Sequence, residues 1–148
     1  ATLTVLLALP LPEMPRPGIR GDFVVANVAI VDVVTGEVLP ARDVQLRNGR
    51  IAAIGDHQPG REALGFRVIE GSGKFLIPGL WDMHVHSLAI SPQYTHPLSL
   101  ANGVTGVREM WSCPGLDDGF VACGTDIERW RAGLRDGTTL APRYIQRS

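Results

Sequence analysis

Two histidines and an aspartate stand at alternate positions in the run Asp82-Met83-His84-Val85-His86. Because successive side chains of a β-strand point to opposite faces, we expect Asp82, His84 and His86 on one face. Imidazole is a preferred ligand of zinc and other borderline divalent metals, and two imidazoles on one strand face can chelate one ion. The spacing therefore predicts that His84 and His86 bind a metal and that Asp82 orients one histidine through its free ring N–H. The alternative is an exposed strand face with an incidental His-x-His pattern.

The elements that would hold these residues follow from the pattern after Pro78-Gly79, where apolar runs alternate with helical patterns. Such alternation is typical of a parallel sheet wrapped by helices, in which the strand ends carry the chemistry. The expected order is a strand over 80–86, a helix over 93–102 that ends at Gly103, a strand over 104–110, a helix that begins at a capping box of Thr125 and Glu128 and closes at Gly137, and a strand that opens at 144–145.

Residues 23–77 form short runs rich in β-branched residues, separated by turn residues. Thr35-Gly36 and Asn48-Gly49 each separate two such runs. Asn-Gly is the strongest short-range hairpin signal, because both positions of the turn need positive backbone angles. We therefore predict a small antiparallel sheet over this whole segment.

The run FLIPGLWDMHVH, over 75–86, resembles the opening barrel strand of the amidohydrolase superfamily, with its PG-hydrophobic-D-x-H-x-H signature. NGVTGVREM, over 102–110, is similar to the second barrel strand of that family, and LAPRYIQRS, over 140–148, to the entry of the third. The region around GVREM is also similar to the imidazolonepropionase and prolidase-like branches. The resemblance covers residues 22–148.

The resemblance implies a mixed β and α/β fold: a partial N-terminal β-sandwich followed by the first strands and helices of an incomplete (β/α)8 barrel. The expected domains are a signal-like or disordered segment with a Pro-rich linker over 1–21, a small antiparallel β-domain over 22–77 and the start of the barrel over 78–148. A complete barrel takes about 250 residues, so we expect the chain to be the N-terminal part of a longer enzyme.

The family hydrolyses amide and related carbon–nitrogen bonds with water activated by one or two divalent ions, usually zinc. By resemblance, His84 and His86 are ligands, whereas the other ligands and the aspartate base come from later strands. The implied partner is a small-molecule or peptide-like substrate. No residue of this chain is assigned as catalytic, and the chain alone is expected to be inactive. The alternative is a non-catalytic β-rich binding or structural module.

Two positions depart from the family pattern, with Gly106 where threonine is common and Glu109 where aspartate is common. Arg108 and Glu109 lie near the end of the second barrel strand, where side chains can approach a substrate. We favour a structural ion pair for them, because charged residues near strand ends often serve packing.

Cys113 and Cys123 lie in the loop after the second barrel strand and can form a disulfide, whereas two free thiols are the alternative. Their spacing matches no zinc motif. His57 and His96 have no partner at ligand spacing, and we expect both to be solvated loop residues.

Composition argues against several classes of partner. The 148 residues are 45% hydrophobic and 20% charged, with a formal net charge of −1, as in ordinary globular proteins. Lys and Arg are scattered, which indicates no binding to nucleic acid or to an anionic membrane. The apolar run over 3–12 is too short to span a bilayer but is similar to part of a signal peptide. We therefore expect a secreted or periplasmic protein, with a cytoplasmic one as the alternative.

Overall fold

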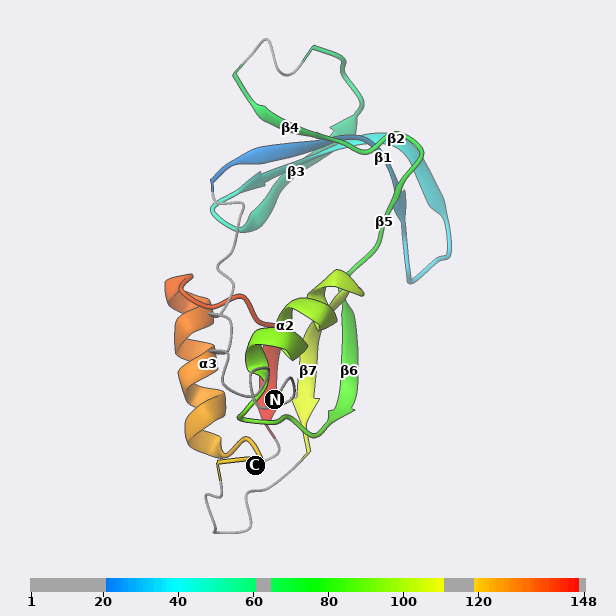
Figure 1. The fold of residues 1–148 in the computed structure, drawn as a ribbon. Helices are drawn as coiled ribbons and strands as arrows, with labels where there is room; N and C mark the ends of the chain where they lie inside the picture. The colour runs from blue at the N-terminus through cyan, green and yellow to red at the C-terminus, as the bar shows by residue number, and fades with distance from the viewer. Residues whose placement is uncertain (1–20, 61–64, 111–118, 147–148) are drawn as a thin grey trace, which may run out of the picture. The chain divides into compact units, whose positions relative to one another are not determined.

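The computed structural model describes residues 21–60, 65–110 and 119–146. They fall into two compact units, of which one ends at Pro78 and the other begins at Gly79. The first unit is a five-stranded sheet, and the second is a three-stranded parallel sheet with helices (Figure 1). The predicted mixed β and α/β class is confirmed, whereas the partial sandwich and the incomplete barrel stay predictions.

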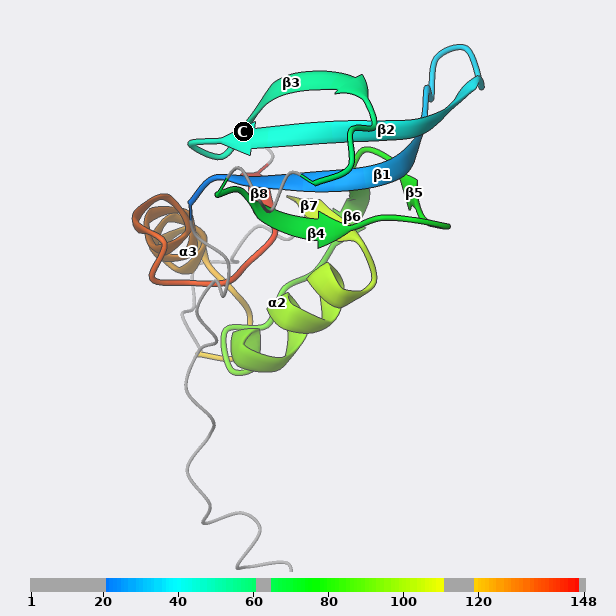
Figure 2. The ribbon, with the colours of Figure 1, turned by 90° about the horizontal axis from the view of Figure 1, so that it is seen from above.

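The sheet of the first unit has the order β3-β2-β1-β4, and β5 also pairs with β1 (Figure 2). Its strands are β1 (Phe23–Val31), β2 (Val38–Arg47), β3 (Arg50–Asp56), β4 (Arg67–Glu70) and β5 (Phe75–Leu76). β1 pairs with β2, and β2 with β3, in antiparallel register. The two predicted hairpins are therefore confirmed.

The two hairpin turns are stabilised in different ways. Asn48 and Gly49 both have positive φ, at 50° and 71°, as the predicted tight turn requires. The turn after β1 is held by Asp32, whose carboxylate accepts the backbone N–H groups of Val34 and Thr35 at 2.8 and 3.1 Å. These two hydrogen bonds lower the pKa of Asp32, because they stabilise the charged carboxylate.

The prediction of an entirely antiparallel sheet is wrong, because β4 and β5 pair with β1 in parallel. The chain does not reverse after β4 and continues along the same edge of β1. There the Gly71 N–H donates to the Ala26 carbonyl at 2.8 Å, and the Ala29 N–H donates to the Lys74 carbonyl at 3.1 Å. A Cβ on Gly71 would lie 2.8 Å from the Cβ of Val28, so only glycine allows this close approach.

The second unit alternates strand and helix, as predicted. Its elements are β6 (Leu80–Val85), α2 (Pro92–Ala101), β7 (Val104–Glu109), α3 (Gly124–Asp136) and β8 (Arg143–Gln146). The three strands are parallel, in the order β6-β7-β8. Helix α2 contacts β7, and α3 contacts β8. Trp130 of α3 meets His96 of α2 with ring centroids 4.8 Å apart, so the two helices pack together on one face of the sheet.

The core of this unit lies between that face and the helices. Its buried members are Val107, Ala122, Ile127, Trp130 and Tyr144. Trp130 and Tyr144 pack with ring centroids 5.3 Å apart. Large aromatic rings provide much of the buried apolar area in so small a core.

Helix α3 begins two residues before its predicted capping box. Its N-cap is Cys123, and the carboxylate of Asp126 accepts the Cys123 backbone N–H at 3.1 Å. Asp126 therefore plays the reciprocal capping role that the sequence pattern assigns to Glu128. The predicted end is confirmed, since Gly137 closes the helix in the left-handed conformation with φ 65°.

One row of residues explains the glycine at position 106. Trp81 of β6 pairs with Gly106 of β7, which pairs with Arg143 of β8. A Cβ at Gly106 would lie 2.4 Å from the Trp81 ring, so the indole occupies the space of a side chain. The Arg143 guanidinium lies 5.4 Å from the centroid of the same ring, within cation–π range.

Replacement of Gly106 by alanine is expected to lower the free energy of unfolding by about 1 to 3 kcal/mol, because the new methyl group overpacks against Trp81. Urea denaturation followed by circular dichroism measures this change. Gly55→Ala is the matched control, because Gly55 also lies in a strand and a Cβ there would meet no atom within 4 Å. In a Trp81→Leu background the cost of Gly106→Ala should shrink, and an equal cost in both backgrounds would contradict the explanation.

Candidate functional site

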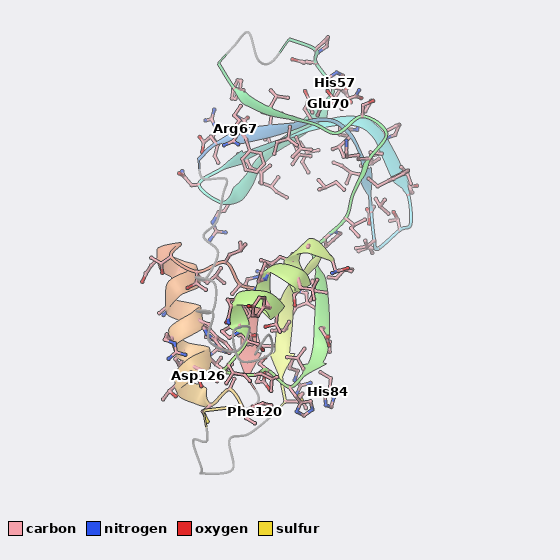
Figure 3. All side chains as sticks on the ribbon, viewed as in Figure 1. His57, Arg67, Glu70, His84, Phe120 and Asp126 are labelled. Carbon is pink, nitrogen blue, oxygen red and sulfur yellow. The ribbon has the colours of Figure 1, made fainter. Side chains whose placement is uncertain are left out.

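His84 lies at the carboxyl end of β6 (Figure 3), and His86 is the first residue after the strand. Both side chains are exposed, and their Nε2 atoms are 3.0 Å apart. Two ligands of a tetrahedral zinc ion with ordinary Zn–N distances lie about 3.3 Å apart. The observed separation of the two Nε2 atoms is therefore a few tenths of an ångström shorter than that of two zinc ligands.

Asp82 contacts the backbone of His84 and so supports the strand end. Its carboxylate accepts the His84 backbone N–H at 3.0 Å. The register between β6 and β7 shifts between Asp82 and Val85, so the simple alternation of faces is interrupted there. A role for Asp82 toward a histidine ring stays a prediction, as does metal binding by His84 and His86.

No cluster of three or more histidine, cysteine, aspartate or glutamate side chains with metal-binding geometry occurs in the parts of the chain that the structure describes. Catalytic zinc normally has three protein ligands and one open position. Within the described ranges, His84 and His86 thus resemble part of a metal site rather than a complete one.

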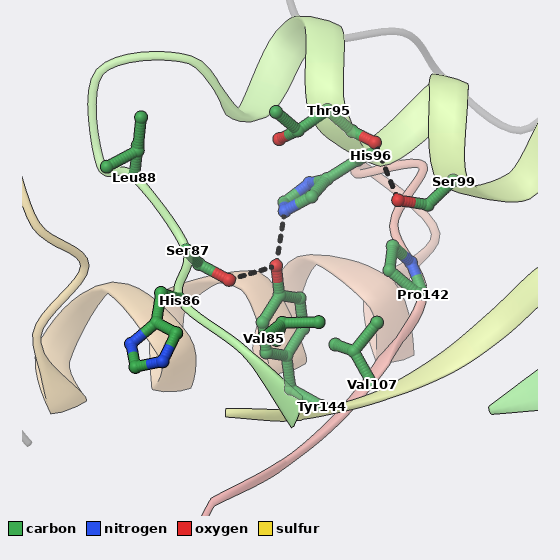
Figure 4. Close-up of a pocket in the computed structure, with 10 residues that line it drawn as sticks. All are labelled: Val85, His86, Ser87, Leu88, Thr95, His96, Ser99, Val107, Pro142 and Tyr144. Atoms are coloured by element: carbon green, nitrogen blue, oxygen red, sulfur yellow. Dashed lines mark hydrogen bonds between the residues drawn. The ribbon is translucent and has the colours of Figure 1, made fainter. Parts of the chain in front are cut away.

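Ser87, the residue after His86, is hydrogen-bonded in three directions. Its backbone N–H donates to the Glu109 carboxylate at 3.0 Å, and its carbonyl accepts the Ala122 N–H at 3.0 Å. Its hydroxyl lies 3.1 Å from the Tyr144 hydroxyl (Figure 4). β7, β8 and the segment before α3 thus all fix this one residue.

The expectation that His96 is a solvated loop residue is wrong. His96 lies inside α2 and is 1% exposed, and its Nε2 is 3.0 Å from the Tyr144 hydroxyl. Burial lowers the pKa of His96 from 6.5 to about 4, so the ring is neutral at pH 7. Pro92 begins the helix and is also buried. The spacing of four between Pro92 and His96 is the signal that could have placed His96 on the inner face.

A cavity of about 210 Å³ lies between α2, the end of β6 and β8 (Figure 4). Its lining includes His86, Ser87, His96 and Tyr144. Burial raises the pKa of Tyr144 to about 12, with a further contribution from the Glu109 charge, so the phenol keeps its proton. The lining therefore offers neutral hydrogen-bonding groups next to His86.

His57 lies in a loop and is partly exposed, as expected, but it also has a buried partner that the sequence did not predict. Its Nδ1 lies 2.7 Å from the carboxylate of Asp43, which is 3% exposed. The same carboxylate accepts the backbone N–H groups of Asn27 and Gln58 at 3.1 and 3.0 Å. Simple alternation of faces would place Asp43 on the polar face of β2. Asp43 is instead buried, and it contacts His57 there. The pair ties the segment after β3 to the sheet.

Glu109 is 1% exposed, and its carboxylate holds the backbone of Ser87, so its observed contact is structural. The predicted ion pair between Arg108 and Glu109 stays a prediction. Cys113 lies outside the described residues, so the predicted disulfide with Cys123 also stays a prediction.

Comparison with curated proteins finds adenine deaminases. The adenine deaminase of Listeria welshimeri is 34% identical over 90 residues, and that of Deinococcus deserti is 39% identical over 90 residues. Each match covers 60% of this chain but only 14% and 16%, respectively, of the relative. No protein-family model matches the chain.

Solved structures share the fold at low sequence identity. A Xaa-Pro dipeptidase with bound methionine matches 85% of this chain and 33% of its own with a TM-score of 0.66 at 17% identity. A prolidase in complex with N-methylphosphonate-L-proline matches 84% of this chain and 31% of its own, with a TM-score of 0.62 at 20% identity. A bottromycin amidohydrolase matches 86% of this chain and 24% of its own, with a TM-score of 0.60 at 24% identity. The chain thus resembles adenine deaminases in sequence over 60% of its length and amidohydrolase structures in fold. The predicted resemblance is thereby confirmed.

The described helices include none with the length and apolar character needed to cross a membrane.

The buried, neutral state of His96 predicts that acid lowers the stability of the second unit. Because the pKa of His96 is about 4 in the folded chain and 6.5 in its ordinary, solvated state, the ring binds a proton more readily in the unfolded chain. The contribution of neutral His96 to the free energy of unfolding is complete above pH 6.5. It is lost as the pH falls toward 4, by up to roughly 3 kcal/mol.

Urea denaturation at pH 7, 5.5 and 4.5 measures this loss. Tryptophan fluorescence reports on the second unit, since all three tryptophans follow Gly79. His96→Gln, which cannot titrate, should show a flatter pH dependence than the wild type. Equal slopes for the two proteins would show that His96 does not carry the effect.

Proposed function

We propose that this chain provides the first metal-binding strand of a metal-dependent hydrolase that cleaves carbon–nitrogen bonds with metal-activated water. The observation that carries the proposal is the 3.0 Å separation of the His84 and His86 Nε2 atoms at the carboxyl end of a parallel strand. In barrels of alternating strands and helices, the active site lies at that end of the strands. The β-unit and the parallel sheet would be the half-sandwich and the first barrel strands of such an enzyme.

His84 and His86 would hold the metal, for which zinc is the best candidate because both donors are imidazoles. The complete enzyme would carry one or two ions, and a bound zinc ion supplies hydroxide at neutral pH by lowering the pKa of water. In this chain, Asp82 holds the backbone of one ligand, and the bonds of Ser87 hold the backbone next to the other. The remaining ligands and the general base would come from outside these residues.

Adenine is the substrate to test first. The curated relatives are adenine deaminases at 34% and 39% identity, whereas the peptide-processing structures share 17% and 20% and so support the fold alone. Adenine deamination replaces the exocyclic amine by water-derived oxygen and releases ammonia, which is hydrolysis of a carbon–nitrogen bond. A peptide-like substrate is the second choice.

The first prediction from this proposal is weak, specific zinc binding by the untagged chain, measured by isothermal titration calorimetry. His84→Ala and His86→Ala should each lower the affinity at least about tenfold, since even indirect supports of metal ligands are worth that much. Met83→Ala is the matched control, because Met83 is 53% exposed and lies between Asp82 and His84 on the same strand. A wild type that ignores zinc would favour the non-catalytic module.

A second prediction concerns turnover. The 148-residue chain with zinc should release no ammonia from adenine above the buffer rate, because two histidines fall short of the three ligands of catalytic zinc. A coupled ammonia assay measures this directly. Zinc-stimulated release that disappears in His84→Ala would show that these residues suffice for catalysis.

A further inference from the structure

The three hydrogen bonds of Ser87 differ in what they constrain. The bonds of its backbone N–H to Glu109 and of its carbonyl to Ala122 fix two points of the residue. A residue that is held at two points can still rotate about the line that joins them. A third hydrogen bond away from that line prevents this rotation. The Tyr144 hydroxyl, 3.1 Å from the Ser87 Oγ, provides that third hydrogen bond.

This third bond acts on the peptide group that links Ser87 to His86. In Figure 4 the Ser87 hydroxyl points toward Tyr144, whereas the His86 ring points away from it. Rotation of Ser87 about the line between its two backbone hydrogen bonds would therefore turn the backbone of His86. This turn would move the His86 ring relative to His84. A shift of about 0.5 Å is enough to loosen a metal-binding pair.

The Tyr144 hydroxyl is itself held from the other side by His96. The His96 Nε2 lies 3.0 Å from it, and the His96 and Tyr144 side chains are 1% and 8% exposed. Water does not compete for hydrogen bonds in so buried a position, so a group left without its partner there is costly. The Nδ1 of His96 has no hydrogen-bond partner within the described ranges, so the bond to Tyr144 is the one that orients the ring.

We propose that Tyr144 and His96 are positioning residues for His86, acting through the Ser87 hydroxyl. The inference rests on the proposed role of His86 as a metal ligand. The two hydrogen bonds that join His96 to Tyr144 and Tyr144 to Ser87 link α2 and β8 to the exposed end of β6. It lowers the cost of ordering the ligand pair, because a ligand on a fixed backbone loses less freedom when it binds.

Tyr144→Phe tests the proposal, because it removes the shared hydroxyl and keeps the ring that packs on Trp130. Zinc affinity of the full chain should fall about threefold to tenfold, less than the 10- to 100-fold typical of a direct contact to a ligand. Tyr94→Phe is the matched control, because Tyr94 lies on α2 and is 52% exposed. Its zinc affinity should stay within about twofold of the wild type.

Amide hydrogen exchange gives a readout that does not depend on metal. Exchange of the Ser87 N–H should accelerate in Tyr144→Phe, whereas the Met110 N–H, which donates to the Val85 carbonyl at 3.0 Å, should keep its rate. Ser87→Ala removes the same hydrogen bond without touching the core and should reproduce both results. It also keeps the test available if Tyr144→Phe fails to fold.

The outcomes separate the two proposals. Selective loss of protection at Ser87 together with weaker zinc binding supports the positioning role. Selective loss at Ser87 in a chain whose wild type does not bind zinc supports the anchoring of His86 and overturns the proposed function. Unchanged zinc affinity and Ser87 exchange, or equal acceleration at Ser87 and Met110, overturns the positioning role.

Discussion

The hydroxyl of Tyr144 joins segments of the chain that are far apart in sequence. It contacts Ser87, 57 residues earlier, and His96, 48 residues earlier, while its ring packs on Trp130. Three parallel strands do not by themselves fix the loops that follow them, because the backbone ladder ends with the strands. The second unit therefore depends on this buried polar junction to hold its helices and the end of β6 in one arrangement.

In the second unit, residues that support the end of β6 differ in exposure from the two histidines proposed to bind a metal. Glu109 and His96, which help to hold the end of β6, are buried, whereas His84 and His86 are exposed. Water does not compete for hydrogen bonds between buried groups, and exposed imidazoles remain able to bind an ion. With this division, the strand end can stay fixed while the two exposed rings change orientation.

Local signals in the sequence predict local structure well. Asn48-Gly49 and Gly137 are assigned correctly because positive φ at these positions is a property of the residue and its immediate neighbours. His84 and His86 lie together as their spacing predicts, although the register shift between Asp82 and Val85 interrupts the simple alternation of faces. The capping of α3 is misplaced by two residues because both Asp126 and Glu128 can reach back to an N-terminal N–H, and only the tertiary position of Cys123 decides between them.

The errors lie where a residue's environment comes from distant segments. The sequence misses the partners of His57 and His96 because these partners, Asp43 and Tyr144, are 14 and 48 residues away. The parallel pairing of β4 with β1 is missed for the same reason, since β-branched runs between turns do not specify the direction of pairing. Exposure of a polar side chain is thus a property of the whole unit rather than of the local pattern.

β1 is the strand on which the first sheet is built, since it pairs with β2 along one edge and with β4 and β5 along the other. Its two edges differ in loop length. The β1–β2–β3 meander closes through short turns, whereas pairing of Phe23 with Arg67 closes a loop of more than forty residues. Because long loops cost more entropy to close, we expect the meander to form first during folding and the parallel strands to join it afterwards. Until β4 and β5 have paired with β1, that edge of β1 has unpaired backbone N–H and C=O groups, with which another extended segment can pair.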